Sequence, residues 1–198
     1  YTRTDSPMHT IQEVIDNAAD EALAGFAKHI HVTLHRDGSV TVADDGRGIP
    51  VGPHPEEQVP VVEIVYTRLH AGGKFDKGAG GAYSFSGGLH GVGVAVTNAL
   101  STRVEVEVRR DGRIHNVVFS ENGEKVSELE TGEACGRQSG TRVRAWPDPK
   151  YFDTARLPVA ELERLLRSKA VLLPGLTVTL QSELGEASRT WRYPLGLQ

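Results

Sequence analysis

The amino-acid sequence predicts an α+β fold, a two-layer sandwich in which helices cover one face of a mixed, mostly antiparallel sheet. Several segments alternate apolar and polar residues, which indicates strands that are buried on one side only. Turn dipeptides such as Asp37-Gly38 and Asn122-Gly123 lie between strand-like segments. Residues 8–25 and 159–173 carry apolar residues at helical spacing. One-sided strands argue against a doubly wound parallel sheet, whose strands are apolar on both faces.

The predicted helix at 8–25 presents two different stripes. One is apolar and has the i, i+3, i+4, i+7 spacing of a buried face. The other contains acids and an amide, without a lysine or arginine between them: Glu13, Asn17, Asp20 and Glu21. This second stripe is either a solvated acidic surface or the wall of a site that binds a cation or activates water. The helix alone does not decide between the two.

The next segments follow strand, turn and loop patterns. Residues 30–34 and 40–42 are predicted strands, and the second ends in the run Asp-Asp-Gly-Arg-Gly-Ile-Pro at 44–50. Residues 59–70 are predicted to form a helix, although β-branched residues weaken that pattern. Residues 71–93 contain nine glycines, and loops of this length are usually functional or disordered. A helix of small residues is predicted at 91–100.

The second half of the chain is predicted to be mostly strands. Residues 104–108, 114–119 and 141–146 show strand patterns, and 176–180 and 190–193 close the sheet. The amphipathic helix at 159–173 ends at Pro174-Gly175. The sequence contains no internal repeat. We therefore expect residues 1–198 to form one domain.

The composition excludes several classes of protein. The chain has 22 basic and 26 acidic residues and a formal net charge of −4, whereas a chain that grips DNA alone is usually basic. The single cysteine, Cys135, excludes a disulfide framework and a cysteine-built zinc site within one chain. No apolar run could span a bilayer and no signal peptide is visible, so we expect a cytoplasmic protein with no membrane partner. Because Tyr1 is not an initiator methionine, we expect a segment of a longer protein.

The glycine-rich segment does not match two common phosphate-binding motifs. A Walker A loop needs a serine or threonine after its lysine, but Phe75 follows Lys74. The run Gly88-x-x-Gly91-x-Gly93 has the reverse of the dinucleotide-binding spacing. Glycines that lead into a helix still expose backbone N–H groups to an anion. The segment is therefore either a phosphate-binding loop or a merely mobile one.

Two further motifs are ambiguous when taken singly. In Asp44-x-Gly46-x-Gly48, a carboxylate at a strand end precedes two glycines that let the backbone approach a flat ligand. The carboxylate can accept a hydrogen bond from an exocyclic amine such as that of adenine, but the motif is also an ordinary strand–turn. Ser139-Gly140-Thr141 alone is a turn into a strand.

The order of these motifs resembles the Bergerat, or GHKL, ATP-binding fold. A Glu…Asn helix comes first, followed by Asp-x-Gly-x-Gly, a glycine-rich lid and Gly-Thr on a late strand. Over almost its whole length the chain is similar to the B subunits of bacterial type IIA DNA topoisomerases, through residues 13–17, 20–25, 44–50, 54–57, 69–75 and 86–93. The topoisomerase IV branch is a better match than the gyrase branch at Arg68-Leu69-His70 and at Lys169-Ala170-Val171-Leu172.

The resemblance implies that the chain binds ATP and Mg²⁺ and gives the helix residues roles. Glu13 would be the general base for the attacking water. Asn17 would hold Mg²⁺, which also takes triphosphate oxygens and waters. Glu21 and Arg47 would form an ion pair at the pocket rim, with Arg47 lying over the base.

The same resemblance implies how the nucleotide is enclosed. Asp44 would receive the adenine amine, helped by a water that Thr141 and Gly48 also hold. Tyr83 would approach the nucleotide from the lid, and Arg110 would lie at the pocket mouth, where aminocoumarin-type inhibitors bind in relatives. The phosphates would be cradled by Lys74 and by the backbone N–H groups of Gly88, Leu89, His90, Gly91, Val92, Gly93 and Val94; no proton transfer is assigned to His90. The apolar walls would be Val14, Val42, Ile49, Val65, Val94 and Val143.

The resemblance also implies a larger assembly. The whole enzyme would pass one DNA duplex through another, as a heterotetramer of A-type subunits and two B subunits. The N-terminal arm, the transducer domain with its catalytic lysine, and the TOPRIM domain would be absent from residues 1–198. We therefore expect this chain to be a monomer that binds nucleotide with little turnover. Residues 76–82 depart from the family pattern, because they are longer and richer in glycine than the usual lid.

Other functions stay open at this point. A gyrase B subunit would use the same domain for negative supercoiling, instead of decatenation and relaxation. A protein kinase of the histidine-kinase type shares the pocket but lacks the water-activating glutamate, so Glu13 argues against it. A chaperone-type nucleotide-gated module is disfavoured by the gyrase-like run at 69–75. If the resemblance misleads, the chain is an α+β ligand-binding domain of unknown use.

Overall fold

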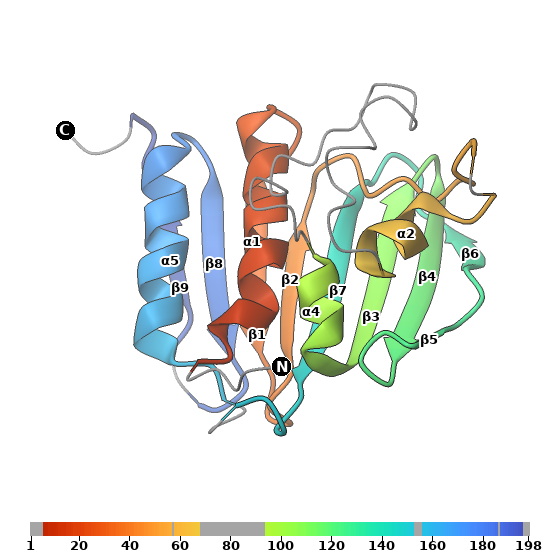
Figure 1. Cartoon of the computed structure of the whole chain (residues 1–198). Helices are drawn as coiled ribbons and strands as arrows, with labels where there is room; N and C mark the ends of the chain where they lie inside the picture. The colour runs from red at the N-terminus through yellow and green to blue at the C-terminus, as the bar shows by residue number, and fades with distance from the viewer. Residues whose placement is uncertain (1–5, 57, 68–93, 153–155, 186, 196–198) are drawn as a thin grey trace.

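The computed structural model describes residues 6–56, 58–67, 94–152, 156–185 and 187–195. Within these ranges the chain forms two layers, with the helices packed on one face of a sheet (Figure 1). The helices are α1 (Met8–Leu23), α2 (Val61–Thr67), α4 (Ala95–Ala99) and α5 (Val159–Leu172). None of these described helices is long and apolar enough to cross a membrane.

A nine-stranded sheet forms the second layer. Its strands follow the order β5-β4-β3-β7-β2-β1-β8-β9, and β6 pairs with β4 beside this path. Strands β1 and β8 are parallel, whereas the other described pairs are antiparallel. The predicted fold class is therefore confirmed. The strands are β1 (His29–Leu34), β2 (Val40–Asp44), β3 (Ser101–Arg110), β4 (Arg113–Ser120), β5 (Lys125–Val126), β6 (Glu130–Ala134), β7 (Gly140–Pro147), β8 (Thr177–Ser182) and β9 (Arg189–Arg192).

The core lies between the helices and the inner face of the sheet. Strand β3 shows how alternation builds it, since Val104, Val106 and Val108 are buried while the residues between them are partly exposed. The apolar stripes of α1 and α5 cover this face with Ile11, Val14, Ile15, Ala18, Leu162, Leu166 and Ala170. An ion pair between Lys169 Nζ and Asp16 Oδ1, 2.8 Å long, joins the two helices.

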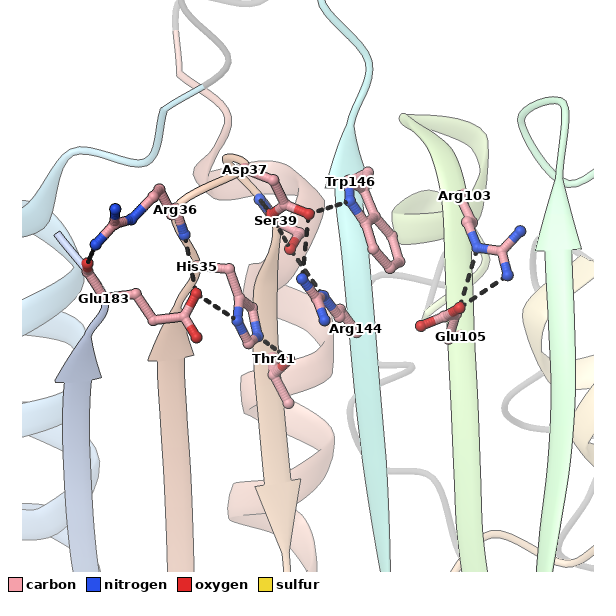
Figure 2. Close-up of polar contacts among 10 residues, drawn as sticks. All are labelled: His35, Arg36, Asp37, Ser39, Thr41, Arg103, Glu105, Arg144, Trp146 and Glu183. Carbon is pink, nitrogen blue, oxygen red and sulfur yellow. Dashed lines mark hydrogen bonds and ion pairs between the residues drawn. The ribbon is translucent and has the colours of Figure 1, made fainter.

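The turn between β1 and β2 is fixed by one carboxylate on the other face of the sheet (Figure 2). Asp37 accepts hydrogen bonds from the Ser39 backbone N–H (2.9 Å) and from Trp146 Nε1 (2.9 Å) on β7. Arg144 Nη2 lies 3.1 Å from the same carboxylate. The predicted hairpin is confirmed, and its turn is tied to a strand about a hundred residues away.

The short elements differ most from the predictions. Helix α2 begins at Val61, two residues after the predicted start, because Pro60 supplies the carbonyl that accepts the Glu63 N–H at 3.0 Å. Helix α4 begins at Ala95, inside the predicted range 91–100. Residues 68–70 and 91–93 of these two predictions lie outside the described residues. Strands β5 and β6 were not predicted, because β5 has two residues and every residue of β6 is exposed, so neither shows alternation.

Candidate functional site

The polar stripe of α1 faces inward. Asn17 is 6% exposed and Glu21 is 4% exposed, and Glu13 is half-buried. The interpretation of this stripe as a solvated acidic surface is therefore wrong. Amides and carboxylates are buried when they have a specific partner or function. The segments that face α1 must therefore supply a partner for these side chains.

Arg47 supplies the partner of Glu21. Its Nη2 lies 2.7 Å from Glu21 Oε1, its Nε lies 3.3 Å from Oε2, and its backbone N–H donates to Oε2 at 2.9 Å. The predicted ion pair is confirmed. Gly46 leaves room for this carboxylate, because a Cβ there would lie 2.6 Å from Glu21 Oε2 and the side chain would have to shift. The helix and the turn after β2 are thus locked together by a fork of charge-assisted hydrogen bonds.

Phe26 completes this arrangement, and the sequence patterns did not predict it. The Arg47 Cζ lies 4.0 Å from the centroid of the Phe26 ring. Gly25 ends α1 with a φ of +87°, and the chain then turns so that the Phe26 N–H donates to the Glu21 carbonyl at 2.9 Å. An aromatic residue just beyond a glycine stop was the available signal, but its partner lies twenty-one residues away and no local pattern points to it.

Asp44 lies at the end of β2 with its carboxylate on the same side as Glu21. Its Oδ1 accepts the Gly46 N–H at 2.8 Å. Burial, with a smaller contribution from the Glu21 charge, raises the pKa of Asp44 to about 7. A half-buried acid with a raised pKa, flanked by another carboxylate, is typical of a functional position.

The backbone around Asp44 is fixed by β7. Thr141, the partner of Asp44 in the β2–β7 register, accepts the Ile49 N–H on its Oγ1 at 3.0 Å. Gly140 must be glycine, because a Cβ there would lie 2.0 Å from the Asp44 carbonyl oxygen. Gly48 has a φ of +84°, and its carbonyl accepts a hydrogen bond from Arg110 Nη1 at 2.8 Å. Three segments, 44–49, Arg110 and 140–141, therefore meet at one backbone corner.

The two aspartates of the Asp-Asp-Gly run have different roles. Asp44 points to the helix side, whereas Asp45 Oδ1 accepts the backbone N–H groups of Lys28 (2.7 Å) and His29 (2.9 Å). Asp45 therefore holds the start of β1. The alternation of side chains along a strand predicts this division, since successive residues face opposite sides of a sheet.

Other predicted site residues are only partly placed. All of the proposed wall residues are buried, which suits a pocket wall and a packed core equally well: Val14, Val42, Ile49, Val65, Val94 and Val143. Lys74, Tyr83, Gly88, Leu89, His90, Gly91, Val92 and Gly93 lie outside the described residues. Their contacts with a nucleotide thus stay predictions.

The described residues are suited to bind a purine and to supply one ligand, Asn17, to a magnesium ion. Asp44 offers an acceptor at a strand end, and Gly48 beside it has a φ of +84°, which glycine adopts readily. Among the described residues, no group of three or more His, Cys, Asp or Glu could hold a metal. A magnesium ion at Asn17 would therefore take its remaining oxygens from nucleotide and water, as this ion commonly does.

A hollow of about 540 Å³ opens among the strand ends. Ala43 and Arg142 line it, and they alternate along β2 and β7 with Asp44 and Thr141. By this alternation the side chains of Ala43 and Arg142 face away from the helices. The hollow therefore opens mainly on the face of the sheet away from α1, but Asp44 and Thr141 also line it, so it adjoins the corner described above.

Comparison with known proteins agrees with this geometry. Residues 2–150 match a family model described as histidine kinase-, DNA gyrase B- and HSP90-like ATPase. The B subunit of DNA topoisomerase 4 from Escherichia coli K12 is 54% identical over 198 residues, which are all of this chain and 31% of that protein. The B subunit of DNA gyrase from Haloferax volcanii is 45% identical over 196 residues, which are 96% of this chain and 30% of that protein. The chain therefore spans about a third of the length of these relatives.

A solved structure is similar in fold. The topoisomerase IV ATP-binding domain of Francisella tularensis, determined in complex with a small-molecule inhibitor, matches with a TM-score of 0.85 and 43% sequence identity. The match covers 100% of this chain and 52% of that chain.

Proposed function

Because the chain belongs to the family of histidine kinase-, DNA gyrase B- and HSP90-like ATPases, we propose that it is the ATP-binding domain of a topoisomerase IV B subunit. The identity of 54% to a topoisomerase IV relative, against 45% to a gyrase relative, supports that branch. Residues 1–198 would form this one domain. In the whole cytoplasmic enzyme, with A-type subunits and a second B subunit, ATP would drive DNA decatenation and relaxation.

The observation that supports this proposal best is the corner built around Asp44. A carboxylate with a raised pKa faces the buried stripe of α1, and Gly48, Gly140 and Thr141 hold the backbone beside it. This arrangement suits a planar base with an exocyclic amine, because the amine can donate to Asp44. Glu13 on α1 argues against a histidine kinase, and the run at 69–75 argues against a chaperone-type module.

The helix residues would act on the other end of the nucleotide. Glu13 lies one turn before Asn17 on α1, so both side chains project from the same stripe. Glu13 would accept the proton of the attacking water, and Asn17 would contribute an amide oxygen to Mg²⁺. The ion, when bound, neutralises charge on the triphosphate. Lys74 and the backbone of 88–94 would hold the phosphates.

Inhibitors would bind beside the same turn, next to Asp44 and Gly48. The related Francisella tularensis domain was solved with a small-molecule inhibitor. In this chain Arg110 donates to the Gly48 carbonyl at 2.8 Å, which places its guanidinium beside the turn that follows Asp44. We expect aminocoumarin-type inhibitors to contact Arg110 and to compete with ATP.

The test compares two neighbouring carboxylates. Asp44→Asn removes the acceptor for the adenine amine and replaces part of it with a donor, so the affinity for a non-hydrolysable ATP analogue should fall at least about tenfold. Asp45→Asn is the matched control, because its remaining oxygen can still accept the N–H groups at the start of β1. Isothermal titration calorimetry measures both. Unchanged affinity in Asp44→Asn would refute the proposed base site.

A second assay separates the two topoisomerase branches. The complete B subunit, assembled with its A-type partner, should decatenate linked DNA circles in the presence of ATP. Introduction of negative supercoils into relaxed DNA would instead assign the protein to the gyrase branch.

A further inference from the structure

Phe26 is an exposed aromatic residue with a defined charged partner. Its side chain is 50% exposed, although an aromatic ring is normally buried for its large apolar area. The ring is in contact with the Arg47 guanidinium, whose Cζ lies 4.0 Å from the ring centroid. That separation lies well within the range at which a cation is attracted to the face of an aromatic ring.

The backbone fixes where this ring lies. The φ of +87° at Gly25 reverses the chain after α1, and the Phe26 N–H then donates to the Glu21 carbonyl at 2.9 Å. Glu21 therefore holds both partners, because its carboxylate binds the Arg47 guanidinium at 2.7 Å and 3.3 Å. Glu21 is itself 4% exposed, so this anchor is rigidly packed.

The two contacts restrain different motions of Arg47. A guanidinium is planar, and a carboxylate that binds its edge fixes its position but lets the plane tilt about that edge. The Phe26 ring, whose centroid lies 4.0 Å from Cζ, restrains the tilt. The orientation of the plane matters to a ligand that stacks on it, since stacking requires the two planes to be nearly parallel.

We propose that Phe26 is a positioning residue for nucleotide binding, which sets the plane of the Arg47 guanidinium so that a purine base can stack on it. This role rests on the proposed ATP site at Asp44. Phe26 acts through Arg47 and does not itself touch the nucleotide. The apolar ring is thereby retained at the surface in spite of its exposure to water.

The expected effect is modest and specific. Phe26→Leu keeps an apolar side chain but removes the aromatic face, so affinity for a non-hydrolysable ATP analogue should fall about two- to fivefold. Phe26→Tyr keeps the face and should bind like the original chain. Leu23→Ala is the matched control, because Leu23 lies at the same end of α1 and is 72% exposed. Thermal unfolding of each variant checks that the fold is intact.

A double-mutant cycle tests whether the effect passes through Arg47. Calorimetric affinities are measured for the original chain, Phe26→Leu, Arg47→Ala and the double variant. In the Arg47→Ala background, Phe26→Leu should cause no further loss, because the group that it orients is gone.

Several results would overturn the proposal. These are an unchanged affinity in Phe26→Leu, an equal loss in Phe26→Tyr, or a loss in Phe26→Leu that persists without Arg47. Failure of the original chain to bind the analogue would overturn the proposed function and this role together, whereas the first three results leave the ATP site standing.

Discussion

Asp44 shows how one side chain can favour ligand binding at the expense of stability. Its pKa is about 7 in the folded chain, against an ordinary value of 3.8, and burial is the main cause. Between these two values the folded chain binds a proton that the unfolded chain does not, so stability rises as the pH falls from 7 towards 4. Above pH 7 the folded chain must keep a poorly solvated charge. An amine donor on a ligand would relieve that cost.

The ligand-free chain should therefore become more stable in Asp44→Asn at pH 8. We expect a gain in the free energy of unfolding of about 1–2 kcal/mol, which is less than the full linkage value because Asp44 is partly exposed. The gain should shrink at pH 5, where Asp44 is protonated and neutral in the folded chain. Urea unfolding at both pH values, with Asp45→Asn as control, measures it. A stability difference that did not change with pH would contradict the raised pKa.

Tyr66 is a second side chain that is costly to the fold. It is 1% exposed and stacks on Phe119 with ring centroids 5.4 Å apart, but its hydroxyl has no hydrogen-bond partner among the described residues. Burial accordingly raises the pKa of Tyr66 far above its usual value. Such an unpaired hydroxyl loses its hydration without compensation.

Removal of this hydroxyl should stabilise the chain. Tyr66→Phe keeps the stacked ring and should raise the free energy of unfolding by about 1 kcal/mol. Tyr193→Phe is the matched control, because the Tyr193 hydroxyl accepts a hydrogen bond from Arg167 Nε at 3.2 Å, and its removal should bring no gain in stability. Denaturant midpoints compare the two variants. A destabilised Tyr66→Phe would show that the hydroxyl has a partner in solution, such as an ordered water.

The β1–β2 turn is fixed to its surroundings through Asp37 (Figure 2). Hydrogen bonds from Ser39, followed by that from Trp146, hold the pKa of Asp37 well below its usual range. A lowered pKa contributes stability that is present above the unfolded value of 3.8 and is lost as the pH falls below it. The charged Asp37 carboxylate in this turn therefore links the β1–β2 hairpin to β7.

Asp37→Ala should lower the free energy of unfolding by about 1–2 kcal/mol at pH 7, because it removes a charged acceptor shared by two strands. Since Asp37 is protonated in the unfolded chain at low pH, the difference should diminish at pH 3. Asp111→Ala, at the exposed β3–β4 turn, is the control and should change stability less. Chemical unfolding at pH 7 and pH 3 measures both. An effect that was equal at the two pH values would exclude the charge as its source.

Elements with a repeating pattern could be predicted from the sequence, and those fixed by distant contacts could not. The alternation in β3 and the apolar stripe of α5 each specify their own structure. Strand β6 has no buried residue and forms because β4 offers a free edge to pair with. The start of α2 depends on Pro60. This proline is a local signal for a helix start, but the β-branched residues around it made the helix pattern difficult to recognise.

At the scale of the whole molecule, the residue types of the site could be predicted from the sequence, whereas the contacts between them could not. The order of motifs along the sequence pointed to Glu21, Asp44, Arg47 and Thr141, and the Glu21–Arg47 pair is present. The contacts that hold these residues together were not predictable, because Gly140 against Asp44 and Phe26 against Arg47 join segments by tertiary packing alone. Motifs identify which groups react, whereas the distances that orient those groups arise only in the folded chain.

The proposed function gives a final prediction. The purified 198-residue chain should bind a non-hydrolysable ATP analogue but release phosphate from ATP slowly, because the lysine that reaches the γ-phosphate in the family would lie in another domain. In the complete B subunit, Glu13→Ala should keep analogue affinity within about threefold and reduce hydrolysis at least about a hundredfold, the usual range for loss of a general base. Glu63→Ala, a carboxylate on α2 outside the site, should leave both unchanged. Calorimetry and a phosphate-release assay separate binding from chemistry. Normal hydrolysis in Glu13→Ala would remove the general base from α1, and rapid turnover by the 198-residue chain would show that the catalytic groups are all within it.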